Sequence, residues 1–337
     1  MADLATLAET PERAAFRRRH PLLAYAARRT GITIVLLVLV SILIFAATAI
    51  LPGNAAAQIL GHSGATAAER ATLSRQLGLD RPLLTQYGTW VGGVLRGNLG
   101  TSLASRQPVT SFIAARLGNS VILALAAIVL MLPLALGLGT IAGIRRGRAS
   151  DHAIASISLG LIALPEFVSG TILAVLFGVT LAWFPPTSII PSGANPLSDP
   201  KLLVLPSLTL CLAGSAYIIR MLRAGVAEQM AGDYVQAARL NGIPERRIVL
   251  RHALRNAMGP TVQVVALTVQ WLVGGIVVVE TVFSYPGLGQ GLVQAVTARD
   301  IPVVQSLTLL IAAFYLMVNL GADILVILLV PKLRTAL

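Results

Sequence analysis

The sequence predicts an all-α polytopic membrane protein with six transmembrane helices. Hydrophobic residues make up 55% of its 337 residues and charged residues 12%, which is about half the charged share of an ordinary soluble domain. The apolar residues also occur in runs that reach the ~20 residues needed to cross a bilayer. Because backbone groups in lipid must be hydrogen-bonded within their own segment, we expect these runs to be helices.

Six spans are predicted from the gaps between charged residues. Only Glu166 and Asp323 interrupt them, and Glu280 stands at the end of the fifth. The predicted spans are residues 32–51, 119–144, 153–182, 202–219, 257–279 and 301–330. The remaining parts are an N-terminal tail at 1–31, an external insertion at 52–118, a polar loop at 225–258 within the core domain 119–330, and a C-terminal tail at 331–337.

The distribution of Lys and Arg predicts the orientation in the cell membrane. One set of segments, residues 1–31, 145–152, 220–256 and 331–337, holds 18 basic residues in 83 positions, and the opposite set holds 8 in 107. We expect the basic side to be cytoplasmic, which places both termini inside. The net charge of +12 then reflects topology and contact with the lipid bilayer, so we expect no nucleic acid partner.

The N-terminal third combines one span with a long external segment. The apolar run at 32–51 is too long for a signal peptide, so we expect it to remain as the first span. In the external insertion, a polar helix is predicted over residues 67–77. A second, amphipathic helix is predicted where apolar residues recur at helical spacing, with its apolar face on the membrane domain or in the lipid interface. These residues are Leu84, Tyr87, Trp90, Val91 and Val94.

The third span contains a proline next to an acidic residue. Pro165 predicts a bend in the helix, and Glu166 beside it is costly in lipid unless it faces a cavity or a partner. Two interpretations stay open: Glu166 lines a path for a solute, or its hydrogen bonds satisfy the bend.

The polar loop between the fourth and fifth spans predicts two helices joined by a tight turn. The first helix covers residues 231–240 and ends at Asn241-Gly242, since Gly adopts the left-handed conformation without a Cβ clash. Pro244 fits the first position of the second helix, which runs from Glu245 to about Ala257. Five Arg between 239 and 255 would also suit a DNA-binding helix-turn-helix, but apolar spans begin within a few residues on both sides.

This loop resembles the cytoplasmic "EAA" loop of ABC importer permeases, most closely the dipeptide/oligopeptide/nickel group. In that family the loop forms coupling helices that dock into a groove on a separate ATPase subunit. Asp233 stands where the family has Glu. The residues that carry the resemblance are Asp233-Tyr234, Ala237-Ala238, Gly242, Glu245-Arg246-Arg247 and the run from Arg251 to Ala257. The coupling role that it implies falls on Asp233, Tyr234, Ala237, Ala238, Gly242, Ile243, Arg246 and Arg247.

A second stretch, Glu280 to Gly289, matches the pattern E-x-x-F-x-Y-P-G-L-G of similar permeases. The resemblance makes Glu280, Tyr285, Pro286 and Gly287 candidates for a gate, and a rigid turn is an equally good interpretation. The external stretches LGLDRPLLTQY and GNLGTS, Arg299-Asp300-Ile301-Pro302 and Asp323 also resemble this group. One interpretation pairs Asp323 with an Arg at the cytoplasmic end of the helices.

The resemblance implies a type I ABC importer permease fold and a defined set of partners. The chain is then the transport subunit of an ATP-driven importer, forming half of the translocation path for peptides or a related small solute. It binds no cofactor itself, and ATP and Mg belong to its partners. Those partners are a second homologous permease, two ABC ATPase subunits and an extracytoplasmic substrate-binding protein.

Two other functional classes, an ion-coupled carrier and an intramembrane serine protease, are alternatives to an importer permease. The only lysines are Lys201 and Lys332, and neither follows a Gly, so this chain has no phosphate-binding loop of its own. An ion-coupled carrier is the first alternative, although three scattered acidic residues supply few ionisable pairs for it. An intramembrane serine protease is a remote one, resting on Gly61-His62-Ser63-Gly64 in the external insertion. Neither Cys211 nor the four His suggests a metal site, because none has ligand spacing to another.

Overall fold

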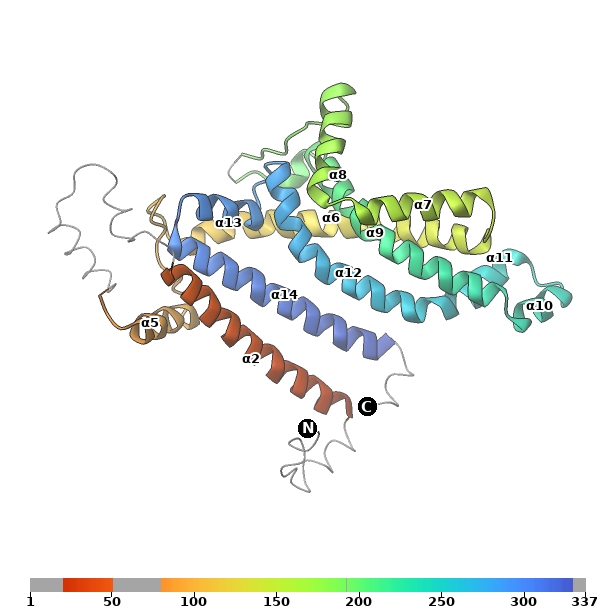
Figure 1. Ribbon diagram of the computed structural model, residues 1–337, viewed down its shortest axis with the longest axis horizontal. Helices are drawn as coiled ribbons and strands as arrows, with labels where there is room; N and C mark the ends of the chain where they lie inside the picture. The colour runs from red at the N-terminus through yellow and green to blue at the C-terminus, as the bar shows by residue number, and fades with distance from the viewer. Residues whose placement is uncertain (1–20, 51–79, 192, 330–337) are drawn as a thin grey trace, which may run out of the picture.

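The computed structural model describes residues 21–50, 80–191 and 193–329 (Figure 1). Within these ranges the regular structure is helical, with one isolated antiparallel bridge between Thr101 and Pro108. Several expectations lie outside them: the tails at 1–20 and 331–337, the helix at 67–77 and the stretch around Ser63.

Within the described residues, five helices are long and apolar enough to cross a membrane, and one bent pair of helices adds a sixth span if the pair is counted as one. The five are α2 (Pro21–Ile50), α6 (Val109–Ile144), α9 (Lys201–Met230), α12 (Leu254–Val282) and α14 (Ile301–Leu329). The predicted spans are therefore confirmed in number and order, but several helices extend past them. α6 begins ten residues before the predicted start, and α9 continues eleven residues past the predicted end. Counting apolar residues finds the membrane-length core of a helix and misses the polar turns that continue it.

The third span is not the single bent helix predicted over 153–182. It consists of α7 (Ala149–Ala163) and α8 (Glu166–Leu173), which meet at 110° and continue into a π-helical turn at Ala174–Thr180. Pro165 lacks an N–H, and Leu164 before it takes the extended conformation that a following proline favours (φ −89°, ψ 123°). Two consecutive non-helical residues turn the expected bend into a break, and α8 runs at a steep angle to α7 (Figure 1) while still contacting α9 and α12.

α9 is the centre of the bundle. Of the residues in its most apolar stretch, 67% are buried inside the chain, a larger share than in any of the other four long helices. α6 and α12 pack along it, and α7 and α8 also contact it. The main core is formed by residues such as Leu123, Met131, Leu210, Ile218 and Leu272. Cys211 lies in this core, as expected for a small apolar residue.

α2 and α14 form an antiparallel pair at one side of the bundle (Figure 1). At one end Arg29 forms an ion pair with Asp323 at 2.5 Å, which confirms the interpretation of Asp323 as the partner of an Arg. At the other end the Gln305 amide donates to the Thr48 hydroxyl at 2.7 Å.

The amphipathic helix predicted in the external insertion is confirmed as α5 (Leu83–Leu95). Its apolar face packs on α2, where Tyr87 and Trp90 form a ring cluster with Phe45. The Tyr87 and Ser41 hydroxyls are hydrogen-bonded at 2.8 Å. The described part of the insertion is therefore held against the first span.

Candidate functional site

The polar loop forms two short helices beyond the ends of α9 and α12 (Figure 1). α10 (Asp233–Leu240) ends at Gly242, which has φ +72°. The N–H groups of Gly242 and Ile243 donate to the carbonyls of Arg239 and Ala238. A Cβ at Gly242 would meet no atom within 4 Å, so backbone conformation and not crowding requires glycine here. The predicted helix–turn–helix is confirmed.

The second helix begins after Pro244, which is the N-cap and not the first helical residue. α11 (Glu245–Ile248) continues through a π-helical turn (Val249–Ala253) directly into α12. The loop is therefore the point at which α9 and α12 are joined, and a displacement of α11 acts on α12 without a flexible linker between them.

An ion pair bridges the turn between α10 and α11. The Arg239 guanidinium donates to Glu245 through Nε (3.1 Å) and Nη2 (2.7 Å). The hydrogen-bonded Glu245 carboxylate also raises the pKa of Arg239. Because both side chains are about half exposed, we assign the pair an orienting role, since exposed ion pairs contribute little to stability. Arg239 and Glu245 were not among the predicted coupling residues, although their opposite charges lie six positions apart in the sequence.

The loop presents an exposed surface on a buried base. Val235 and Ile248 are fully buried and hold the two helices to the bundle. Ala238 and Ile243 are half-buried. The exposed side includes Leu240, whose exposure of 90% is the highest among the exposed large hydrophobic residues of the described chain. Leu240 was not among the predicted coupling residues. The predicted ones on this exposed side are Asp233, Tyr234, Ala237, Gly242, Arg246 and Arg247.

The second motif, Glu280 to Gly289, caps the start of α13, a short helix that was not predicted from the sequence. α13 (Leu288–Thr297) starts at Gly287 as its N-cap. The carboxyl group of Glu280 accepts hydrogen bonds from the N–H groups of Gly289 (2.7 Å) and Gln290 (3.2 Å). Glu280 therefore satisfies backbone donors that the first turn of a helix otherwise leaves unpaired.

Ser120 of α6 completes this cap. Its hydroxyl donates to Glu280 at 2.6 Å and accepts from the N–H of Leu288 at 2.8 Å. The glycines of the motif allow the start of α13 to lie close to α12. A Cβ at Gly287 would overlap the Glu280 carboxyl group, and one at Gly289 would overlap the Val277 backbone.

Tyr285 and Pro286 are tied to α6 by reciprocal hydrogen bonds. The Tyr285 hydroxyl donates to the carbonyl of Asn119 at 2.8 Å, and the Asn119 amide donates to the carbonyl of Pro286 at 2.9 Å. Burial, followed by the nearby Glu280, raises the pKa of Tyr285, which keeps the hydroxyl a donor. The structure thus brings all four predicted gate residues together. The burial of Glu280, Tyr285 and Gly287 favours the rigid-turn interpretation for these side chains, and a gating role stays a prediction.

Two external stretches that were singled out separately are also joined. Asp300, 3% exposed, accepts from the hydroxyl of Ser102 and from the N–H groups of Leu103 (3.1 Å) and Ala104 (3.2 Å). The carboxylate between α13 and α14 therefore holds the loop that precedes α6.

Glu166 lies in the first turn of α8, half-buried. Among the described residues it has no ion-pair partner, and the carbonyl of Pro165 accepts from the N–H groups of Val168 and Ser169. Gly170, one turn later, packs against Phe283 and Val282 at the end of α12. A role for Glu166 in the solute path stays a prediction.

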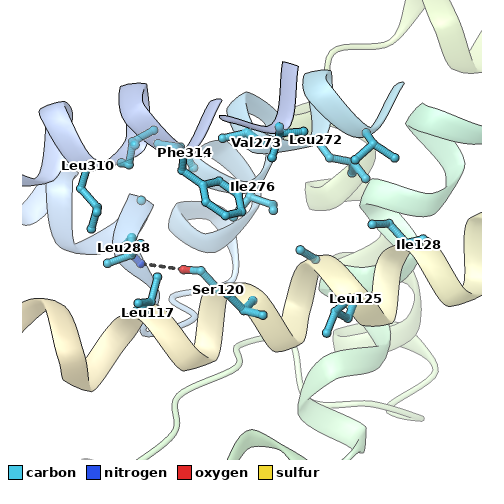
Figure 2. A pocket seen from close by; sticks show the side chains of 17 residues that line it. Leu117, Ser120, Leu125, Ile128, Leu272, Val273, Ile276, Leu288, Leu310 and Phe314 are labelled. Atoms are coloured by element: carbon cyan, nitrogen blue, oxygen red, sulfur yellow. Dashed lines mark hydrogen bonds between the residues drawn. The ribbon is translucent and has the colours of Figure 1, made fainter. Parts of the chain in front are cut away.

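An apolar cavity of about 200 Å³ lies between α6, α12 and α14. Figure 2 shows Leu117, Ser120 and Leu125 on one wall and Ile276, Leu310 and Phe314 facing them. Ser120 and Gly289 line both the cavity and the Glu280 cap. The lining is otherwise almost entirely apolar, so the cavity offers no polar group beyond those that the cap already uses.

Comparison with known proteins covers nearly the whole chain. The family described as binding-protein-dependent transport system inner membrane component matches residues 135–335, and its N-terminal membrane component matches residues 22–126. The chain is 36% identical over 333 residues to the di/tripeptide transport system permease protein DppB of Pseudomonas aeruginosa, covering 93% of this chain and 99% of the relative. It is 36% identical over 313 residues to the glutathione transport system permease protein GsiC of Escherichia coli, with the same two shares.

These matches extend from α2 to the end of the chain and include both motif regions. The chain therefore belongs to the binding-protein-dependent transport system inner membrane components, as the multi-pass permease subunit of an ABC importer whose ATPase is a separate polypeptide.

Proposed function

We propose that this permease imports peptides or a related small solute, and that α10 and α11 couple it to the ATPase. Its first partner is a second homologous permease with which it encloses the translocation path. Two ABC ATPase subunits, which bind ATP and Mg, lie at the α10–α11 end, and an extracytoplasmic substrate-binding protein docks at the opposite end. Both termini of the chain are then cytoplasmic, as the distribution of basic residues predicts.

The observation that carries the coupling proposal is the exposed tip on its buried base. Leu240, 90% exposed and next to the exposed Arg239, offers an apolar side chain to a contact surface, and burying a Leu side chain stabilises a complex by ~1.5–3 kcal/mol. The small residues Ala237 and Gly242 allow close approach to a groove. Asp233, Arg246 and Arg247 are exposed and free to pair with charges at its rim.

The substrate class rests on the relatives, whose names specify di/tripeptides and glutathione. The two alternatives considered above, an ion-coupled carrier and an intramembrane protease, are not the class to which the family belongs.

Uptake by the complete importer in proteoliposomes tests the proposal. With the substrate-binding protein outside and ATP inside, we expect uptake of radiolabelled dialanine or glutathione. Uptake should stop when ATP is replaced by a non-hydrolysable analogue and continue when an ionophore removes the ion gradients. Failure of every short peptide and of glutathione, with another solute transported, would overturn the substrate class alone. Uptake that follows an ion gradient without ATP would overturn the ATP-driven mechanism.

A further inference from the structure

An ion pair with a buried carboxylate and a partly exposed guanidinium joins the start of α7 to the last third of α9. Asp151, in the first turn of α7, is fully buried. Its carboxylate accepts from Nε and Nη2 of Arg223 on α9, the second at 2.9 Å, and from the N–H of Gly147 at 2.9 Å. Arg223 is seven residues before the end of α9 at Met230, and α10 follows directly. Asp151 therefore fastens the α6–α7 turn to the part of α9 that leads into the coupling helices.

α6 packs closely against the same part of α9, with glycines of α6 facing side chains of α9. A Cβ at Gly139 would lie 3.0 Å from the Cβ of Leu222, and one at Gly143 would lie 2.7 Å from the Cβ of Val226. Both distances are shorter than ordinary van der Waals contact, so the two backbones are as close as glycine allows. The ion pair fixes the start of α7 to α9, and the glycine contact fixes α6 to the same part of α9. The last third of α9 is therefore attached to both helices that flank the α6–α7 turn.

α12 closes the other side of α9. A Cβ at Gly225 would lie 3.1 Å from that of Ala257, and Ala257 belongs to the buried cluster that includes Leu222 and Val226. The two helices that emerge from the coupling loop thus converge on one packed layer together with α6. Packed layers of this density move as units and do not deform continuously.

α6 connects this layer to the outer turn. It is a continuous helix of 36 residues, which corresponds to ~54 Å. Its far end carries Asn119 and Ser120, which hold Pro286, Glu280 and the start of α13. A displacement of the end of α6 near Gly143 therefore reaches the turn at Glu280 through one uninterrupted helix, which contains Pro133.

We propose that Asp151 and Arg223 are positioning residues for coupling. Their ion pair makes the α6–α7 turn follow α9 when the ATPase moves α10 and α11, so that α6 transmits the movement to the Glu280 turn. The inference rests on the proposed coupling function. It differs from docking, because Asp151 is buried and cannot touch the ATPase.

The test is the number of ATP molecules hydrolysed per dialanine imported by the complete importer in proteoliposomes. For Asp151→Asn, which keeps the size but removes the charge, we expect the ATPase to be retained and hydrolysis to continue. Uptake should fall so that the ratio rises roughly tenfold, within the range by which mutations between sites change coupling. Arg223→Lys keeps the charge but loses the bidentate geometry, and we expect a smaller rise.

Asp323→Asn is the matched control, because it breaks an interhelical ion pair that lies on α2 and α14 and not on α9. Its ratio should stay near that of the wild type. If Asp151→Asn reduces only the amount of assembled complex, with an unchanged ratio per complex, the pair is a folding contact and the inference is overturned. An equal rise for Asp323→Asn would overturn it as well.

The same assay separates this inference from the proposed function. If the wild-type chain retains no ATPase or shows no ATP-dependent uptake, the proposed function fails. If the wild type is coupled and both variants at the Asp151–Arg223 pair keep its ratio, only the positioning role fails. The double variant Asp151→Asn with Arg223→Gln removes both charges and so leaves neither without a partner. If a single variant does not assemble, the ratio is measured on the double variant, where we expect the same rise.

Discussion

The carboxyl group of Glu280 lies beneath the first turn of α13 and accepts a 2.7 Å hydrogen bond from the N–H of Gly289. The two residues belong to one motif, and the contact explains why that motif places Glu at the end of one helix and Gly in the first turn of the next. Ser120 of α6 reinforces the contact from outside the motif.

Removing the Glu280 carboxyl group should destabilise the chain. In Glu280→Ala the N–H groups of Gly289 and Gln290 lose their acceptor, and each buried donor left unpaired costs ~1–3 kcal/mol. Glu280→Gln keeps one acceptor oxygen, so we expect a clearly smaller loss. Thermal unfolding in detergent measures both, with the exposed Glu245→Ala as a control that should stay within ~1 kcal/mol. Equal stability of Glu280→Ala and the wild type would contradict the capping role.

A methyl group at Gly289 should be as damaging as the loss of its partner. Its Cβ would overlap the backbone of Val277, and forced repacking of this kind costs ~1–3 kcal/mol. Gly274→Ala on α12 is the matched control, because a Cβ there meets nothing within 4 Å, and alanine is the better helix former. We expect Gly289→Ala to lower the unfolding temperature and Gly274→Ala not to lower it. The opposite order would show that the turn is loosely packed.

Leu240 should anchor the ATPase. Leu240→Ser removes an apolar side chain worth ~1.5–3 kcal/mol on burial, so we expect the affinity of the ATPase for the permease to fall at least about tenfold. Leu84→Ser on α5 is the control, because Leu84 is 85% exposed but distant from the coupling loop. Titration of the purified ATPase onto nanodiscs of each variant gives the two dissociation constants, and equal values would remove Leu240 from the interface.

Asp300 should protect the loop between α5 and α6 against proteolysis. Asp300→Ala leaves the Ser102 hydroxyl and two backbone N–H groups without their acceptor, at ~1–3 kcal/mol for each buried group. Trypsin cleavage after the exposed Arg106 should then accelerate by about tenfold or more, because local opening becomes more frequent. The control is Asp199→Ala, an exposed carboxylate that accepts from the N–H of Lys201. An unchanged cleavage rate in Asp300→Ala would mean that other contacts hold the loop.

The sequence predicted those features that depend on local chemistry. The turn at Gly242 was predictable because positive φ selects glycine and proline soon follows. The spans were predictable because lipid demands long apolar helices. The 110° break at Leu164-Pro165 was predicted only as a bend, since the same dipeptide is compatible with a kinked helix when neighbours satisfy the freed carbonyls.

The features that the sequence did not reveal depend on residues far apart in the chain. Ser120 and Glu280 are 160 positions apart, and Asp151 and Arg223 are 72 apart. No local pattern links such residues, although the polar pair Asn119-Ser120 at the start of an apolar span indicated that this end of α6 has polar partners. α13 was missed because its amphipathic pattern is short and follows a Gly/Pro turn.

Retention of the ATPase by the full-length chain is the most direct test of the central claim. The wild-type chain, Gly242→Trp and Gly97→Trp are each purified in mild detergent with the ATPase subunits co-expressed. Gly97 is the matched control, because it also has positive φ (+76°) and open space around it but lies beyond α5. We predict that the wild type and Gly97→Trp retain an active ATPase and that Gly242→Trp loses it. Retention of the ATPase by Gly242→Trp at the wild-type level would contradict docking through α10 and α11.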